Sequence, residues 1–180
     1  MRRIACLLAL CAASIASMGA AKPADICKGA PSPEEPWTSW RQSGNAIAGG
    51  ESGSVARLIL GKPVVATLRP VSQVQFAVKP AKIQPKSHGG LFTLALKDAA
   101  RVGVALSAPA WVDVVTAQHM HTSIEHGHGP ECSGIRKIVW FDLPPGVHLI
   151  QISGASAREV RIMAADANAN RLAPHVRDED

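Results

Sequence analysis

Beyond Gly53 the apolar residues of the sequence recur at every second position in short segments, and turn-forming residues separate these segments. Alternation of this kind places apolar side chains on one face of a β-strand, and many short, evenly spaced strands are typical of a sandwich or jelly roll. The expected strands are 64–68, 74–78, 91–96, 102–106, 111–115, 137–143, 147–153 and 159–163, with 56–60 as a weaker ninth. The sequence therefore predicts an all-β fold, a single jelly-roll-like β-sandwich of about 8 antiparallel strands.

The N-terminal residues follow the order of an export signal. A positively charged start, an uncharged apolar run over residues 4–16 and small residues up to Ala21 succeed one another. The run is too short to span a bilayer. Cleavage after Ala21 places Gly19 and Ala21 at the two positions that must be small. We therefore expect residues 1–21 to be a signal peptide, and the mature chain to be exported to the periplasm or secreted, without insertion into a membrane.

Composition shifts divide the remaining chain into three parts. Residues 22–53 form an irregular arm rich in Pro, Gly and Ser, residues 54–165 form the β-sandwich domain, and residues 166–180 form a polar tail. Two of the 19 Lys and Arg residues lie in the signal, so the mature chain carries a net charge of +3 instead of +5. A charge this weak and scattered does not predict nucleic acid or anionic lipid as a partner.

One short helix is expected within the arm. Ser32 suits the N-cap, Pro33 the first helical position, and Glu35 completes a capping box. Trp37 and Trp40 follow at helical spacing. We expect the two tryptophans to anchor the arm on the domain.

Cysteine usage becomes simple once the signal is removed, because only Cys27 and Cys132 remain. Two cysteines in an oxidising compartment most simply form a disulfide bond. Such a bond ties the N-terminal arm to the loop before the last strands. The alternative is a free or metal-bound Cys132.

Residues 92–163 have a familiar pattern. Alternation in LFTLALKDAARVGVAL and WVDVV, a Cys-bearing loop and the segment IVWFDLPPGVHLIQISG resemble the small bacterial β-sandwich modules of the pre-peptidase C-terminal type. Those modules accompany secreted enzymes and are noncatalytic, which implies the same for this chain. The sequence departs from that type at Arg101, Val102 and His148, where tyrosines are usual.

The chain is also similar to a group of small exported proteobacterial proteins. The similarity rests on HGHGP at residues 126–130, Cys132, GIRK at residues 134–137 and the turn at Pro145 and Gly146. Members of that group often carry a homogentisate 1,2-dioxygenase name, so the resemblance implies an iron-dependent dioxygenase as an alternative function.

About 20 residues separate the expected strands 111–115 and 137–143, a length typical of a functional or mobile connection. His119 and His121 alternate around Met120, so on a continued strand both point to one face, where two imidazoles can share a metal. The glycines around His126 and His128 let the backbone fold this second pair toward the first. Further potential ligands are Glu125, Met120 and Cys132.

This set predicts a metal site formed by His119, His121, His126, His128 and Glu125. Histidine and carboxylate suit Zn, Cu, Ni or Fe, and a methionine favours copper, so Cu or Zn is the expected ion. The alternative is a solvated histidine-rich loop that binds metal only adventitiously. Asp113, between two valines, is a candidate carboxylate for orienting a ligand histidine, or a residue that caps a turn or faces water.

The dioxygenase alternative implies the cupin pattern, in which HxH is followed by Glu. His119, His121 and Glu125 fit this fragment, and His148 loosely fits the second motif. The register then fails, because Asp113 stands where the first motif has Gly and the spacer between the motifs is too short. An iron-dependent site would consist of those three residues and His148.

Other catalytic motifs are absent from the sequence. It contains no GxSxG, no HExxH, no P-loop and no dinucleotide fingerprint. Arg136 and Lys137 fit either an anionic ligand or a solvated strand end. We therefore expect a noncatalytic binding module for a protein or small-molecule partner, or for a transition metal, with the metal (Fe)-dependent dioxygenase as the alternative.

Overall fold

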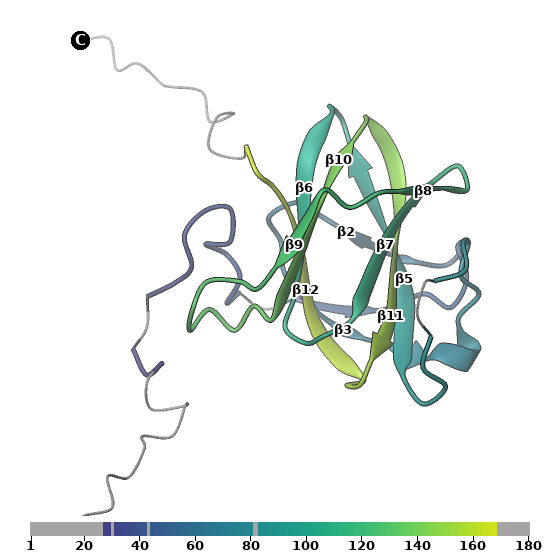
Figure 1. Cartoon of the computed structure of the whole chain (residues 1–180), viewed down its shortest axis with the longest axis horizontal. Helices are drawn as coiled ribbons and strands as arrows, with labels where there is room; N and C mark the ends of the chain where they lie inside the picture. The colour runs from purple at the N-terminus through teal and green to yellow at the C-terminus, as the bar shows by residue number, and fades with distance from the viewer. Residues whose placement is uncertain (1–26, 30, 43, 81–82, 169–180) are drawn as a thin grey trace, which may run out of the picture.

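The computed structural model describes residues 27–29, 31–42, 44–80 and 83–168, so the predicted signal peptide and most of the predicted tail lie outside the described residues. The all-β prediction is confirmed: two mixed sheets of six strands each form a sandwich (Figure 1). Within the described residues, no helix has the length and apolar character needed to cross a bilayer.

Sheet A has the strand order β1-β3-β12-β6-β10-β9, and sheet B has the order β2-β5-β11-β7-β8 with β4 paired to β5. The strands of sheet A are β1 (Asn45–Ile47), β3 (Val64–Thr67), β12 (Glu159–Asp166), β6 (Ala100–Leu106), β10 (Lys137–Leu143) and β9 (Glu125–Gly127). The strands of sheet B are β2 (Ala56–Leu58), β5 (His88–Leu96), β11 (Gly146–Ala155), β7 (Trp111–Thr116), β8 (His119–His121) and β4 (Arg69–Pro70). All the expected strands except 74–78 are present, and the predicted strand 137–143 has the observed bounds of β10.

The predicted antiparallel arrangement holds for the long strands, but the pairing is parallel at one side of each sheet. β1 pairs parallel with β3, and β2 pairs parallel with β5. The chain passes from β1 in sheet A to β2 in sheet B and back to β3, so it re-enters sheet A in its original direction. The same crossing brings β5 into sheet B parallel to β2. The long central pairs, such as β6 with β10 and β11 with β5, are antiparallel as expected.

The predicted strand 74–78 does not form. A single 3-10 turn, η1 (Val71–Gln73), precedes this stretch, which then lies against the outer face of sheet B. The buried Gln151 side chain accepts hydrogen bonds from the backbone N–H groups of Ala77, at 2.7 Å, and Val78, at 3.2 Å, and donates one to the Val78 carbonyl, at 2.9 Å. A side-chain amide therefore satisfies backbone groups that a neighbouring strand would otherwise pair.

The predicted helix in the arm is also wrong. Residues 34–42 form successive turns, in which the Trp37 N–H donates to the Glu34 carbonyl and the Trp40 N–H donates to the Trp37 carbonyl, both at 2.9 Å. Pro36 falls inside the predicted helix, where its missing N–H and its ring oppose helical backbone. The anchoring role of the tryptophans holds, since both are buried against the outer face of sheet A with Ile135, Ile138 and Met163.

Cys27 and Cys132 form the predicted disulfide, with their sulfur atoms 2.10 Å apart. The bond joins the arm to the loop before β10. Together with the two tryptophans it fixes the arm on sheet A, on the side away from the main core.

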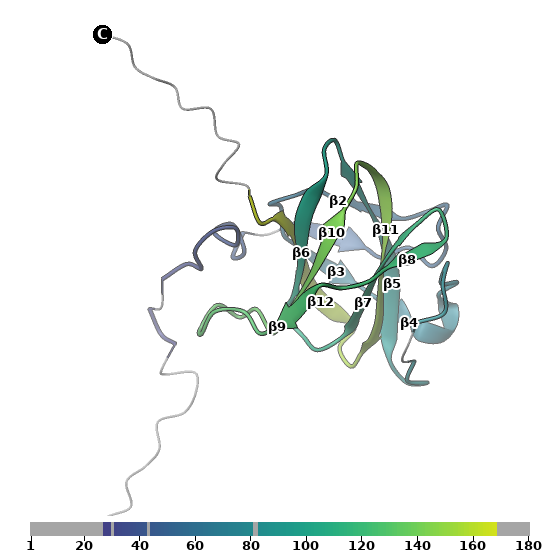
Figure 2. The ribbon, with the colours of Figure 1, turned by 45° about the horizontal axis from the view of Figure 1, so that its top comes forward.

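The main core lies between the sheets and is built from the alternate, inward-facing residues of the long strands. It includes Phe92, Leu94, Val102, Val104, Val112, Val114, Val139, Phe141, Ile150, Ile152 and Ile162. At one side of the sandwich the last strands are the short β8 and β9. The chain between them crosses from sheet B to sheet A, as Figure 2 shows.

Candidate ligand pocket at the β8–β9 edge

The two predicted histidine pairs lie on different sheets. β8 continues sheet B, with His119 opposite Thr116 and His121 opposite Val114 on β7. The alternation therefore places His119 and His121 on one face, as predicted. β9 belongs to sheet A, where His126 lies opposite Val139 on β10.

Directly opposed residues of neighbouring strands share a face of the sheet. Val114 and Val139 belong to the core between the sheets, so His121 and His126 both occupy the inward face of their sheets. The two imidazoles therefore stand at the same open edge of the sandwich, one from each sheet.

A pocket of about 500 Å³ lies at this edge and includes both rings in its lining. Its apolar walls come from Trp111, Val112, Met120, Val139 and Phe141, and its polar lining comes from Asp113, His121, Thr122, Ser123, His126 and Lys137. An apolar pocket with a few converging polar groups is the usual form of a small-molecule site.

A hydrogen-bonded chain holds the ring of His121. The Thr116 hydroxyl lies 2.8 Å from Nε2 of His121 and 2.6 Å from Nδ1 of His148. Nε2 of His148 lies 2.9 Å from the carbonyl oxygen of Pro144. The two rings meet edge to face, with centroids 5.7 Å apart, and His148 is fully buried.

When both rings are neutral, the carbonyl at the end of this chain fixes the direction of every hydrogen bond in it. A carbonyl can only accept, so Nε2 of His148 donates to Pro144 and its Nδ1 accepts from the Thr116 hydroxyl. Thr116 then accepts from Nε2 of His121, which leaves Nδ1 of His121 with the free lone pair. Burial, followed by the neighbouring His148 and His119, lowers the pKa of His121 and keeps the ring neutral at pH 7.

Lys137 enters the pocket from β10. Its ammonium donates to the carbonyl of Ala110, at 2.8 Å, and lies 4.7 Å from the centre of the Trp111 ring. Burial lowers the pKa of Lys137, and the charge of Asp113 acts in the opposite direction. Stacking on an aromatic face and a carbonyl contact stabilise the ammonium in this partly desolvated position.

Asp113 lies on β7, opposite Gln151 of β11, and is only 8% exposed. Its Oδ2 atom is buried and has no hydrogen-bond partner among the described residues. Burial raises the pKa of Asp113, and Lys137 partly offsets this rise. Across the described part of the chain, no hydrogen bond joins Asp113 to a histidine, so its predicted role in orienting a ligand ring is not seen.

The other predicted metal ligands are dispersed. His119 is exposed, Glu125 lies opposite Trp140, on the outer face of sheet A, and Nδ1 of His128 lies 2.8 Å from the Arg136 carbonyl. Cys132 is in the disulfide. In the described segments, no group of three or more His, Cys, Asp or Glu side chains is placed to hold a metal ion. Within the iron set, the rings of His121 and His148 lie side by side, but both ring nitrogens of His148 are already hydrogen-bonded, and His119 and Glu125 lie apart from them.

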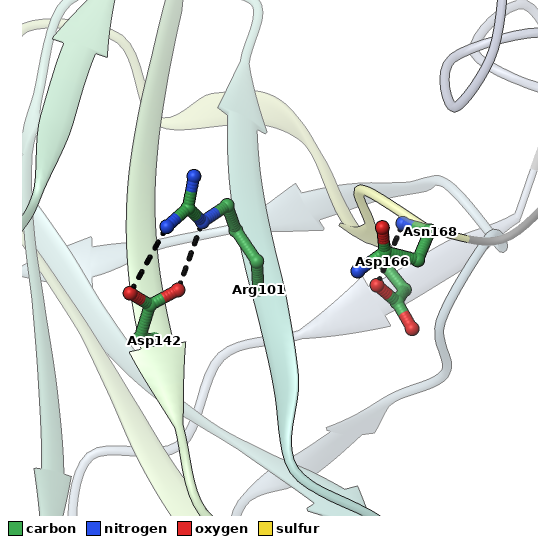
Figure 3. A network of polar contacts seen from close by, with 4 residues as sticks. All are labelled: Arg101, Asp142, Asp166 and Asn168. Atoms are coloured by element: carbon green, nitrogen blue, oxygen red, sulfur yellow. Dashed lines mark hydrogen bonds and ion pairs between the residues drawn. The ribbon is translucent and has the colours of Figure 1, made fainter.

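A second, shallower hollow of about 600 Å³ lies where β6 begins and β10 ends. Arg101 and Asp142 line it and form an exposed bidentate ion pair, with Nε donating to Oδ1 at 2.9 Å and Nη2 donating to Oδ2 at 3.2 Å (Figure 3). The hydrogen bond from Arg101 lowers the pKa of Asp142. Because these two charges already neutralise each other, the hollow offers a ligand fewer groups to pair with than the pocket at the β8–β9 edge does.

The sequence pattern assigns no role to Thr116 or Trp111 in this site. It indicates Lys137 only as one end of a basic pair, and His148 only within the iron set. A signal for His148 exists in the sequence, since it alternates with Ile150 and Ile152 in an apolar strand. The chain matches no known family model and no curated protein.

Proposed function

We propose that this protein is an exported, noncatalytic β-sandwich module that binds a small organic molecule in the pocket at the β8–β9 edge. The observation that carries the proposal is the apolar pocket of about 500 Å³ that is lined by His121 from sheet B and by Lys137 from sheet A. Titratable groups whose pKa values are shifted by burial gather preferentially at functional sites.

The hydrogen-bonded chain behind His121 supports binding rather than proton transfer. In a catalytic triad the orienting group is a carboxylate, which stabilises the imidazolium that forms during the reaction. Here the chain ends at the neutral carbonyl of Pro144. It fixes the position and tautomer of His121 without offering charge to a protonated ring.

The test uses 1-anilinonaphthalene-8-sulfonate, an aromatic anion whose fluorescence rises in apolar surroundings. We expect saturable binding to the mature protein. Ser123→Trp places a large side chain in the loop that lines the pocket and should weaken dye binding at least tenfold. The matched control is Ser52→Trp, at an exposed turn elsewhere, which should leave it unchanged. Equal dye affinity in both variants would refute the pocket as the binding site.

A second candidate function is transition-metal binding, and one observation favours it. Histidines that bind metals usually donate their other ring N–H to a fixed acceptor, and Thr116 holds His121 in that way. His126 lines the same pocket from the opposite sheet, together with the thioether of Met120. We infer that a Cu or Zn ion would be bound by His121 Nδ1 and His126, rather than by all four loop histidines.

This candidate is tested on tag-free protein by thermal melts with Cu²⁺ or Zn²⁺. A bound ion stabilises the folded state by mass action, about 2.7 kcal/mol at a hundredfold excess over the dissociation constant. The double variant His121→Ala, His126→Ala should lose this stabilisation, whereas His119→Ala, His128→Ala should retain it. Equal losses in both double variants would point to adventitious binding by the loop.

A further inference from the structure

One charged side chain begins on the inward face of the sandwich, among the apolar residues of the pocket. Residues directly opposed across two strands share a face of the sheet, and Lys137 lies opposite Leu106 of β6. Leu106 belongs to the core between the sheets. Lys137 therefore leaves β10 on the same face as Val139 and Phe141, which follow at alternate positions and line the same pocket.

The ammonium of Lys137 reaches from sheet A to the start of β7 in sheet B. It donates to the Ala110 carbonyl, at 2.8 Å, and lies 4.7 Å from the centre of the Trp111 ring. An ammonium has three N–H donors, so two remain for a ligand. The contacts with Ala110 and Trp111 fix the charge at one end of the pocket, whereas His121, opposite Val114, lines it further along β7.

Within the described residues, no carboxylate neutralises this ammonium at contact distance. The ion pair found there joins Arg101 to Asp142, on the outer face of sheet A. Asp113 leaves β7 on the outer face of sheet B, opposite Gln151, so its charge acts on Lys137 only from a distance. Burial lowers the pKa of Lys137, because the ammonium loses part of its hydration in this position.

The charge of a suitable ligand follows from this arrangement. A cation is repelled by the Lys137 ammonium, and a neutral molecule leaves that ammonium without a counter-ion. An anion with two or more charges carries more charge than one ammonium compensates, and the excess is unfavourable beside apolar walls. A single negative charge joined to an apolar body suits both the ammonium and the walls.

We propose that the molecule bound under the function proposed above is a small monocarboxylate with an apolar body. Its carboxylate accepts hydrogen bonds from the two remaining N–H donors of the Lys137 ammonium, beside Trp111. Its apolar body packs between the sheets, against the inward side chains of Val112, Val139 and Phe141. This assignment rests on the proposed function, because it takes the same pocket as the binding site.

Isothermal titration calorimetry of the mature protein with hexanoate, hexanamide and acetate tests this assignment. Hexanamide has the shape of hexanoate without its charge, and acetate has the charge without most of the apolar body. We expect hexanoate to bind at least tenfold more tightly than either of the other two, because it alone can use both the ammonium and the apolar walls.

Three variants locate the charge that recognises the carboxylate. Lys137→Met should weaken hexanoate binding at least tenfold and leave hexanamide binding unchanged. The matched control Lys97→Met removes an exposed ammonium outside the pocket lining and should change neither affinity. Asp113→Asn should not weaken hexanoate binding, because this carboxyl faces the other side of sheet B. If Lys137→Met fails to fold, the comparison of the three ligands on the unaltered protein still decides.

Failure of this assignment is distinguishable from failure of the proposed function. The assignment is overturned if hexanoate does not bind at millimolar concentration, if hexanamide or acetate binds as tightly, or if Lys97→Met or Asp113→Asn weakens hexanoate binding as much as Lys137→Met does. The pocket remains the binding site in those cases, provided that Ser123→Trp still removes dye binding. If Ser123→Trp leaves dye binding intact, the proposed function is refuted as well.

Discussion

Removal of the Cys27–Cys132 disulfide should be among the most destabilising changes that leave the native contacts in place. The two cysteines are 105 positions apart in the sequence. In the chain-entropy model, a loop of this length reduces the entropy of the unfolded chain enough to stabilise the fold by about 4.7 kcal/mol at 25 °C. Because whole domains are stable by only about 5–15 kcal/mol, the loss is a large share of the total.

The native arm should nevertheless stay docked without the bond. Trp37 and Trp40 are buried to 4% and 3% exposure, and the rings of Trp37 and Trp140 have centroids 5.7 Å apart. None of these contacts involves the sulfur atoms of Cys27 or Cys132. The double variant Cys27→Ser, Cys132→Ser should therefore keep the tryptophan emission of the native protein while it unfolds at lower denaturant.

Urea unfolding followed by tryptophan fluorescence and by circular dichroism measures both effects. With a slope of about 2 kcal/mol per molar urea, the expected midpoint decrease is about 2 M. Reduction of the unaltered protein with dithiothreitol should give the same decrease. A loss under about 1 kcal/mol, or red-shifted native emission that shows an undocked arm, would refute an effect exerted through the unfolded chain.

Three further changes test the packing, the histidine chain and the pH dependence. Gly90→Ala would place a Cβ 2.2 Å from that of Ala48, so urea unfolding should show a loss of about 1–3 kcal/mol, whereas Gly53→Ala, with open space around it, should show little. Thr116→Val removes the hydroxyl between His121 and His148 and should lower the free energy of unfolding by about 1–3 kcal/mol. In the unaltered protein, ¹⁵N NMR should find both rings protonated at Nε2. In the folded protein the pKa of His121 lies below its usual 6.5, and burial is the main cause. The unfolded chain therefore binds a proton at His121 more readily than the folded chain does. As a result, the free energy of unfolding falls as the pH drops below about 6.5. His121→Asn should reduce this fall in thermal melts from pH 7 to pH 5, and an unchanged pH profile would contradict the shifted pKa.

The strands that the sequence predicts best are those whose apolar residues face the core. In β10 the inward Val139, Phe141 and Leu143 alternate with other positions, so periodicity alone gives its bounds. β1 and β9 lie at the two sides of sheet A and have only three residues each. Neither strand is long enough to show an apolar alternation. Their pairing depends on partners distant in the sequence, which a local pattern does not contain.

The failed predictions have a common cause in tertiary contacts. The stretch 74–78 has a strand-like composition, but its backbone groups are satisfied by the side chain of Gln151, which lies far along the chain. The candidate site shows the same division. The sequence identifies His121 and His126, whereas their separation into two sheets and the role of Lys137 follow only from the register of β8 and β9 with their partners.

The features that made β8 and β9 hard to predict also keep the pocket open. If residues 119–127 carried regular apolar alternation, longer strands would extend both sheets, and their inward side chains would fill the space beside Val112 and Phe141. Instead, this stretch is polar and largely exposed, its strands have three residues each, and the core ends where the pocket begins. A desolvated ammonium at Lys137 reduces the stability of that edge. A sandwich under selection for stability alone would have an apolar residue at this position, so the presence of Lys137 in the pocket lining favours a ligand as its partner.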